Sequence, residues 1–135
     1  MIRDISKYIK DDFEARLFIK YGTDWFSRGI PKSVYMKASK QATEKNYGIN
    51  EKNQMVTEWN CVTISQCQQI ATYGANWSDI FAESYAMPNV KGTKAEKTDW
   101  MIQFDKIKSK DLMTYSVTEK EYKFLQEIFD WLFGK

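Results

Sequence analysis

The stretch Tyr21-Gly22-Thr23-Asp24-Trp25-Phe26-Ser27-Arg28-Gly29-Ile30-Pro31 lies between two segments with helical patterning. Trp25, Phe26 and Ile30 are large apolar side chains, and such side chains stabilise a fold when they leave water. A solvated linker would gain nothing from them. The stretch is therefore predicted to be a packed corner that sets the angle between the first helix and the rest of the chain.

Apolar residues recur at helical spacing on both sides of this corner. The first amphipathic helix is predicted from about Ile5 to Tyr21, with Gly22 as its C-terminal stop. Pro31 fits the first turn of a second helix, which ends at about Asn46. The polar face of the first helix is mixed in sign, which favours core packing over a membrane surface. The apolar positions are Ile2, Ile5, Ile9, Phe13, Leu17 and Phe18, then Val34, Tyr35, Ala38 and Ala42.

Three capping boxes precede later apolar stripes, at Thr63–Gln66, Thr93–Glu96 and Thr118–Glu121. Asn76 is predicted to cap a further short helix, which Pro88 ends. The polar segment 47–55 is predicted to be a mobile loop, and the segment 55–61 fits either a strand or a turn. The inward side chains expected in the last helix are Tyr122, Leu125, Ile128, Phe129 and Leu132. Together these patterns predict one domain, 1–135, folded as an all-α bundle of about six helices.

The composition narrows the chemistry. The chain has no histidine, so it lacks the commonest general base and the commonest metal ligand. Cys61 and Cys67 have neither zinc-site spacing nor histidine partners, and they are predicted to be buried free thiols of a reduced compartment rather than a disulfide. No metal site and no cofactor are predicted. The start of the chain lacks a signal-peptide pattern and no segment has an apolar run long enough to span a membrane, so the protein is expected to be cytoplasmic, with no membrane partner.

The charged residues point weakly to an anionic ligand. Seventeen lysines and three arginines give a net charge of only +2, and the scarcity of arginine disfavours specific nucleic-acid readout. A lysine row near residues 91–110 is interleaved with carboxylates, so a solvated helix face competes with a weak anion-binding surface. The residues expected to contact RNA or a nucleotide are Arg28, Lys106, Lys108, Lys110 and Tyr115.

Short motifs along the chain occur in the order Tyr21-Gly22-x-Asp24-Trp25, Gly29-Ile30-Pro31, Asn76-Trp77-x-x-Ile80-Phe81 and Val117-Thr118-x-x-Glu121. This order resembles the HEPN superfamily, in the branch found in the yeast transcript-surveillance endonuclease and in bacterial defence proteins. The resemblance implies an α-helical and commonly dimeric domain, whose active members cleave RNA without a metal ion. Phe13, Trp25 and Phe26 are then the expected interface residues of a homodimer.

The resemblance also implies that the catalytic motif is degenerate here. Active members carry an arginine, then a polar residue, and a histidine five positions after the arginine. Lys108, Ser109 and Met113 stand at the matching positions. Methionine cannot transfer a proton, and lysine lacks the planar fork of arginine.

The leading hypothesis from the sequence is a non-catalytic HEPN-like binding domain. It would act as a subunit or regulatory module with a protein partner, in prokaryotic or phage defence. RNA or nucleotide binding without cleavage is the alternative. An enzyme of unrecognised type is a third hypothesis, which no residue pattern favours.

Overall fold

The computed structural model describes residues 1–112 and 116–134, and it is all-α. Eight α-helices and no β-strand occur in this described part, where about six helices were predicted. The α-helices are α1 (Ile2–Tyr21), α2 (Trp25–Arg28), α3 (Lys32–Asn46), α4 (Ile64–Ala71), α5 (Ala82–Tyr85), α6 (Lys94–Lys97), α7 (Asp99–Leu112) and α8 (Glu119–Phe133). Short 3-10 helices cover Gly22–Asp24, Lys52–Gln54 and Trp59–Cys61, and a π-helix covers Trp77–Phe81.

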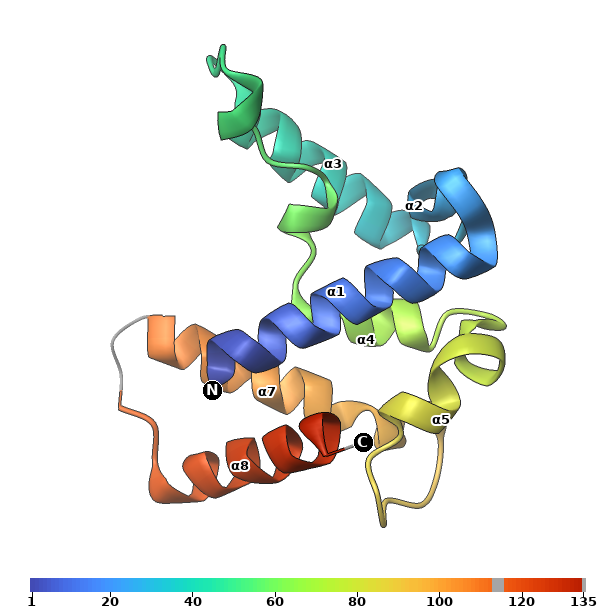
Figure 1. Ribbon diagram of the computed structural model, residues 1–135, viewed down its shortest axis with the longest axis vertical. Helices are drawn as coiled ribbons and strands as arrows, with labels where there is room; N and C mark the ends of the chain where they lie inside the picture. Colours follow the sequence, from blue (N-terminus) through green and yellow to red (C-terminus); the bar gives the residue numbers. More distant parts are fainter. Residues whose placement is uncertain (113–115, 135) are drawn as a thin grey trace.

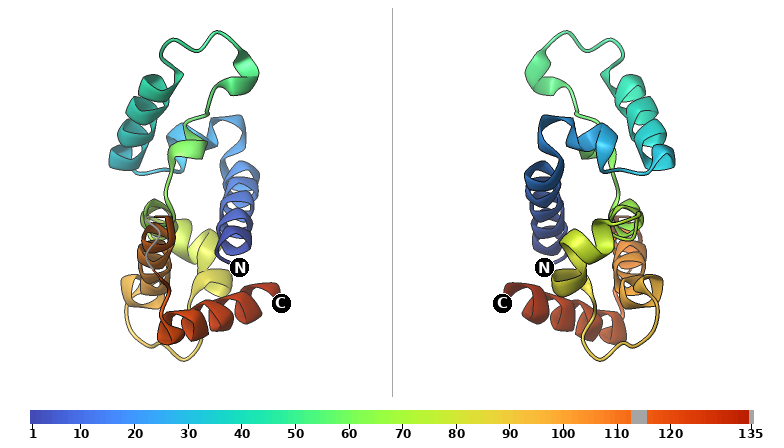
Figure 2. Two further views of the ribbon diagram at one scale, coloured as in Figure 1. Left: turned by 90° about the vertical axis from the view of Figure 1, so that its left-hand side faces the viewer. Right: turned by 90° about the vertical axis from the view of Figure 1, so that its right-hand side faces the viewer.

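Helix α1 crosses the middle of the molecule, with α4 and α7 on one side and α8 alongside its N-terminal half (Figures 1 and 2). Its inner stripe, Ile5, Ile9, Phe13 and Leu17, has no exposed surface. Helix α4 packs along α7, and Asp105 on α7 accepts hydrogen bonds from the backbone N–H and the hydroxyl of Ser65 on α4. Helix α3 and the loop after it project away from this body (Figure 1).

The corner from Tyr21 to Pro31 is packed, as predicted. Gly22 ends α1 with a φ of 77°, and its N–H donates to the carbonyl of Phe18. Gly29 lies so close to the ring of Tyr21 that an added Cβ would stand 2.6 Å from it. Only a glycine fits there without moving the ring, and Ile30 beside it is 3 % exposed.

Asn76 is the polar centre of this corner and not the helix cap that the sequence predicted. Its side chain does not cap the π-helix that follows it. Instead, Asn76 accepts a hydrogen bond from the Tyr21 hydroxyl and donates to the carbonyls of Gly29 and Ile70, each at 2.9 Å. At 1 % exposure, Asn76 ties three separate segments together.

All three capping boxes are confirmed, because each threonine accepts from the backbone N–H three residues on and each glutamine or glutamate side chain accepts in return. The helix that begins after Thr93 is nevertheless only one turn long. Thr98 is buried, donates to the carbonyl of Lys94 at 2.7 Å and accepts from Gln68. The threonine thereby ends α6, and α7 begins at Asp99.

The remaining loop predictions have mixed outcomes. The segment 55–61 contains a 3-10 helix and no strand. The Asn46 side chain bonds to both the N–H and the carbonyl of Val56, which closes the base of the loop 47–55. The mobility of that loop stays a prediction. Cys61 and Cys67 are buried free thiols, as predicted.

Candidate functional site

The predicted nucleic-acid residues do not share one surface. Arg28 lies at the end of α2, where its guanidinium stacks 5.9 Å from the Tyr21 ring. On α7, Lys106 faces a shallow groove with Phe124, whereas Lys108 faces α1. Lys110 is ion-paired with Glu121 at 2.8 Å. Tyr115 lies outside the described residues.

The predicted degenerate motif is likewise only partly visible. Lys108 lines a cleft beside α1, whereas the neighbouring Ser109 is exposed and does not line it. Met113 lies outside the described residues. Nothing in the arrangement of the first two residues distinguishes a lost active site from an ordinary helix face.

The predicted interface residues also separate. Phe13 was expected at a surface, which is wrong: its ring has no exposed area and stacks on Phe81 at 4.2 Å, because it belongs to the inner stripe of α1. Trp25 and Phe26 are half-buried and face Trp59 and Tyr35. These two rings pack the corner against the 3-10 helix Trp59–Cys61 and against α3.

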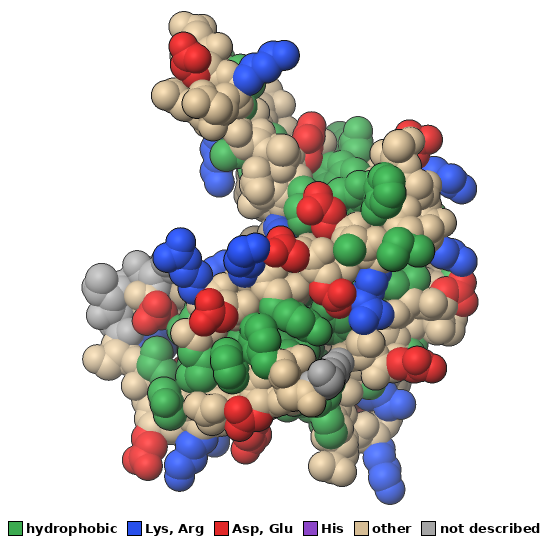
Figure 3. Space-filling view, in the orientation of Figure 1, with side chains coloured by type: hydrophobic (Ala, Val, Ile, Leu, Met, Phe, Trp, Pro, Cys, Tyr) green, Lys and Arg blue, Asp and Glu red, His purple; other side chains and the backbone are tan. Residues whose placement is uncertain are grey.

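A cleft of about 540 Å³ is the most developed candidate site. It lies between the N-terminal half of α1, the segment 57–64 and α7, in the hollow that Figure 3 shows between α1 and the projecting α3. Its lining residues are Arg3, Ser6, Lys7, Lys10, Asp11 and Glu14 from α1, Thr57, Trp59, Asn60, Val62 and Ile64 from the connecting segment, and Lys108. Lysine and arginine side chains stand along its edge (Figure 3).

Lys10 is the cation at the floor of the cleft. Its ammonium donates to the carbonyl of Trp59 and, at 2.6 Å, to that of Val62, and it lies 4.2 Å above the Trp59 ring. Burial lowers the pKa of Lys10 from its ordinary value, and the nearby charge of Lys108 lowers it further. The cleft therefore holds cations that repel one another, a condition that an incoming anion relieves.

Ser6 adds an unused polar atom to the same cleft. Its hydroxyl oxygen is buried and has no hydrogen-bond partner among the described residues. Leaving a buried hydroxyl unpaired costs free energy, and a ligand that bonds to it recovers that cost. No sequence signal marked this serine, because the other walls of the cleft come from segments more than 50 positions away.

The charges of the cleft are positive on balance but not uniform. Four cations, Arg3, Lys7, Lys10 and Lys108, face two carboxylates, Asp11 and Glu14. Lys7 is already paired with Asp11 at 2.5 Å. The cleft thus suits a ligand with a localised negative charge better than an extended polyanion.

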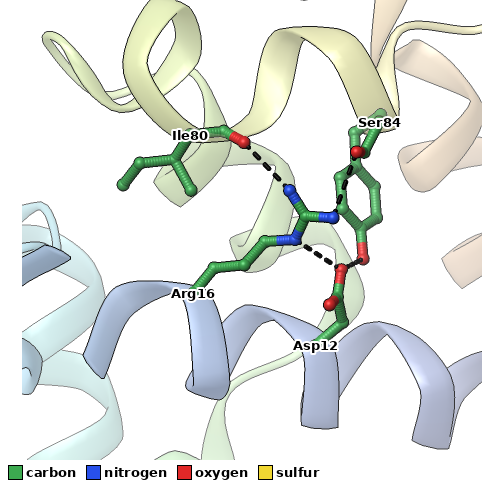
Figure 4. A network of polar contacts seen from close by, with 5 residues as sticks. Asp12, Arg16, Ile80 and Ser84 are labelled. Atoms are coloured by element: carbon green, nitrogen blue, oxygen red, sulfur yellow. Dashed lines mark hydrogen bonds and ion pairs between the residues drawn. The ribbon is translucent and has the colours of Figure 1, made fainter. Parts of the chain in front are cut away.

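A second polar cluster joins α1 to the segment 80–85 (Figure 4). Arg16 donates to Asp12 at 2.8 Å, to the carbonyl of Ile80 at 3.1 Å and to the Ser84 hydroxyl at 3.1 Å. The Tyr85 hydroxyl donates to Asp12 at 2.6 Å, and burial followed by this hydrogen bond raises the pKa of Tyr85 above its ordinary value. These groups satisfy one another, so the cluster is explained by the fold.

Potential metal ligands are dispersed, and both thiols are buried, in the described part of the chain. Within residues 1–112 and 116–134, no three acidic or cysteine side chains come together as metal ligands. Burial raises the pKa of the Cys67 thiol to about 12, which leaves it protonated at neutral pH and unreactive. In the same ranges, no helix is both long enough and apolar enough to cross a membrane.

Comparison with known proteins adds no relative. No protein-family model, no curated protein and no solved structure matches the chain.

Proposed function

We propose that this chain is a non-catalytic binding domain that receives an acidic segment of a partner protein in the cleft beside α1. One observation carries the proposal: four cations and an unpartnered serine hydroxyl converge on a single concave surface. Lys7 and Lys10 already have partners. A carboxylate in the cleft would therefore accept hydrogen bonds from Lys108 and from Ser6, and charge-assisted hydrogen bonds of this kind are strong.

A protein segment fits the cleft better than a nucleic acid for two reasons. Asp11 and Glu14 on the rim would repel successive phosphates. Trp59, the aromatic ring of the cleft, is 7 % exposed and covered by the Lys10 ammonium, so no base can stack on it. RNA or nucleotide binding through phosphate contacts to Lys108 is the second candidate, supported by the positive balance of the cleft.

The wider setting of the proposal comes from the sequence. The HEPN resemblance suggests a subunit or regulatory module in prokaryotic or phage defence, able to form a homodimer and lacking the ribonuclease motif. These are proposals that rest on the resemblance.

The test compares two fluorescent probes by anisotropy at low and moderate salt: a short peptide that carries one glutamate among neutral residues, and an oligouridine. The variants are Lys108→Glu and the matched control Lys106→Glu, which makes the same charge change on the opposite side of α7. We expect Lys108→Glu to weaken peptide binding about tenfold or more, and Lys106→Glu to change it less than about twofold, because rim charges act locally.

Each result decides between the candidates. Binding of the oligouridine, with a steep loss on adding salt and on Lys108→Glu, would replace the protein ligand by RNA. Equal sensitivity to both variants would show a diffuse charge effect and overturn the cleft as the site. Binding of neither probe would overturn the proposal.

A further inference from the structure

An apolar groove runs along the neighbouring face of α1, between that helix and α8. It has a volume of about 300 Å³ and is lined by Asp4, Lys7, Tyr8, Asp11, Phe129 and Phe133. The ring centroids of Tyr8 and Phe133 are 5.0 Å apart, and those of Phe129 and Phe133 are 4.5 Å apart. Figure 3 shows a continuous apolar patch over this part of the molecule, which opens to solvent.

The apolar stripe of α8 is wider than the core requires. Leu125, Ile128 and Leu132 are at most 2 % exposed and account for the packing of this helix. A second row, Tyr122, Phe129 and Phe133, lies at the i, i+7 and i+11 positions, which share one face of a helix. Tyr122 was predicted to point inward, but it is 56 % exposed, and Phe133 is 44 % exposed.

Acidic side chains dominate the edges of the groove. Asp4, Lys7 and Asp11 line the groove on its α1 edge. On α8, Glu119, Lys123 and Asp130 share by their spacing a helix face next to the aromatic row, and Asp130 is the one beside Phe129 and Phe133. Both lysines are already used, Lys7 by Asp11 at 2.5 Å and Lys123 by Glu119 at 3.8 Å. Asp130 is bonded only to the amide of Gln126 among the described residues, and Asp4 has only the chain amine at 4.0 Å.

We propose that this groove binds an amphipathic helix of a partner protein that carries lysine or arginine along its flanks. Two features of the groove support this kind of partner. The apolar strip between two helices matches the way a third helix inserts side chains at i, i+4 and i+7. The carboxylates on both edges, Asp4 and Asp130, stand where basic flanking residues of such a helix would pair with them.

The groove and the cleft are separate sites on one helix. Lys7 and Asp11 form the ridge between them, since they line both. The groove proposal does not rest on the anion-binding proposal, because the two sites attract opposite charges. Failure of one leaves the other standing, and the variants of one site serve as controls for the other.

The test uses two designed helical peptides of about 18 residues, or five turns. Both carry leucine at i, i+4, i+7 and i+11, and their flanks carry lysine in one peptide and glutamate in its twin. Titration calorimetry and amide chemical-shift mapping follow binding to the full chain. We expect the lysine peptide to bind at least about tenfold more tightly than its twin and to shift the amides of α1 residues 4–11 and of α8.

Two variants with matched controls sharpen the test. The double variant Asp4→Lys, Asp130→Lys should reduce the preference for the lysine peptide about tenfold. The control Asp24→Lys, Glu44→Lys makes the same charge change on exposed residues elsewhere and should leave that preference unchanged. Phe133→Ser should weaken binding of the lysine peptide about tenfold. Because Phe133 is half-exposed, the fold should survive that change, and a circular dichroism spectrum checks this.

Three outcomes would overturn the proposal. The first is that neither peptide binds, and the second is that both bind equally. The third is a concentration-dependent dimer in sedimentation equilibrium that disappears in Phe133→Ser, which would assign the groove to a second copy of this chain.

Discussion

The two halves of α1 share one buried stripe but differ in what the fold does with their polar groups. In the C-terminal half, Asp12, Arg16 and Tyr21 all bond to residues of the segment 76–85. In the N-terminal half, Lys10 bonds to the carbonyls of Trp59 and Val62. The Ser6 hydroxyl there has no partner among the described residues, and Lys7 pairs only with its neighbour Asp11. Polar groups that the fold satisfies hold it together, whereas unused ones remain available to a ligand. Both candidate sites lie at the N-terminal half for this reason.

The largest expected effect is at the C-terminal half. Asn76→Ala removes the donor to two buried carbonyls and the acceptor of the Tyr21 hydroxyl. The expected loss is about 3 kcal/mol of unfolding free energy, because buried groups are left unpaired. Urea titration followed by circular dichroism measures it. Tyr21→Phe removes only one of the three bonds and should cost about 1 kcal/mol; an equal loss in both variants would contradict the central role of Asn76.

The two ion pairs of α1 give a direct comparison at the same i, i+4 spacing. Asp12→Ala should cost about 1–2 kcal/mol, because Asp12 also accepts from Tyr85 and its side chain is only 27 % exposed. Asp11→Ala should cost less than about 0.5 kcal/mol, because the Lys7–Asp11 pair is exposed. Urea midpoints measure both. Similar losses would mean that the two halves do not differ as described.

A surface pair outside α1 provides a reference whose pH dependence follows from the pKa of Glu121. The hydrogen bond from Lys110, followed by that from the Thr118 backbone, lowers the pKa of Glu121 to about 2 from its ordinary value of 4.5. A lowered pKa means that the stabilisation is present above pH 4.5 and is lost as the pH falls toward 2. The difference in urea midpoint between the wild type and Glu121→Gln should therefore narrow across that range. A difference that stays constant from pH 6 to pH 2 would argue against the pair, and the effect should be smaller than that of Asp12→Ala.

The smallest expected effect on stability is at Ser6. Ser6→Ala removes a hydroxyl that has no partner among the described residues. The free energy of unfolding, measured from the urea midpoint, should therefore change by less than about 0.5 kcal/mol. The affinity of the peptide with a single glutamate should nevertheless fall severalfold if the hydroxyl binds its carboxylate. A loss of stability similar to that of Asp12→Ala would mean that Ser6 is already satisfied by the fold.

The sequence predicted best what depends on neighbours along the chain. The three capping boxes involve residues three apart, and Gly22 ends the helix directly before it, so local patterns suffice. The packed corner was predicted because its aromatic residues could not be explained as a linker. The all-α class follows from these same local signals.

The sequence did not predict hydrogen-bond partners that lie far apart along the chain. Asn76 bonds to residues 47 and 55 positions away, so a cap was the only role that its neighbours suggested. The break between α6 and α7 depends on Gln68, which lies 30 positions before Thr98. The contact of Gln68 with Thr98 lies at one of the two places where the structure has an additional helix, and the other is α2 within the corner.

The candidate sites were missed for different reasons. Lys106 and Lys108 are two positions apart on a helix and cannot face the same way, so their separation was predictable. The groove could not be predicted, because Tyr122 and Phe129 have the same helical spacing as core residues. Which of the two apolar rows of α8 is buried depends on where α1 packs against that helix, and the sequence does not give this position.

The Lys10 ammonium above the Trp59 indole has an optical consequence. A charge 4.2 Å from the ring, together with Trp25 at 5.3 Å, sets the wavelength and the intensity at which Trp59 emits light. A ligand carboxylate that draws Lys10 away from the ring would change that emission without any added dye. The emission of Trp59 should therefore respond to occupation of the cleft, and a variant in which the four other tryptophans are replaced would isolate it.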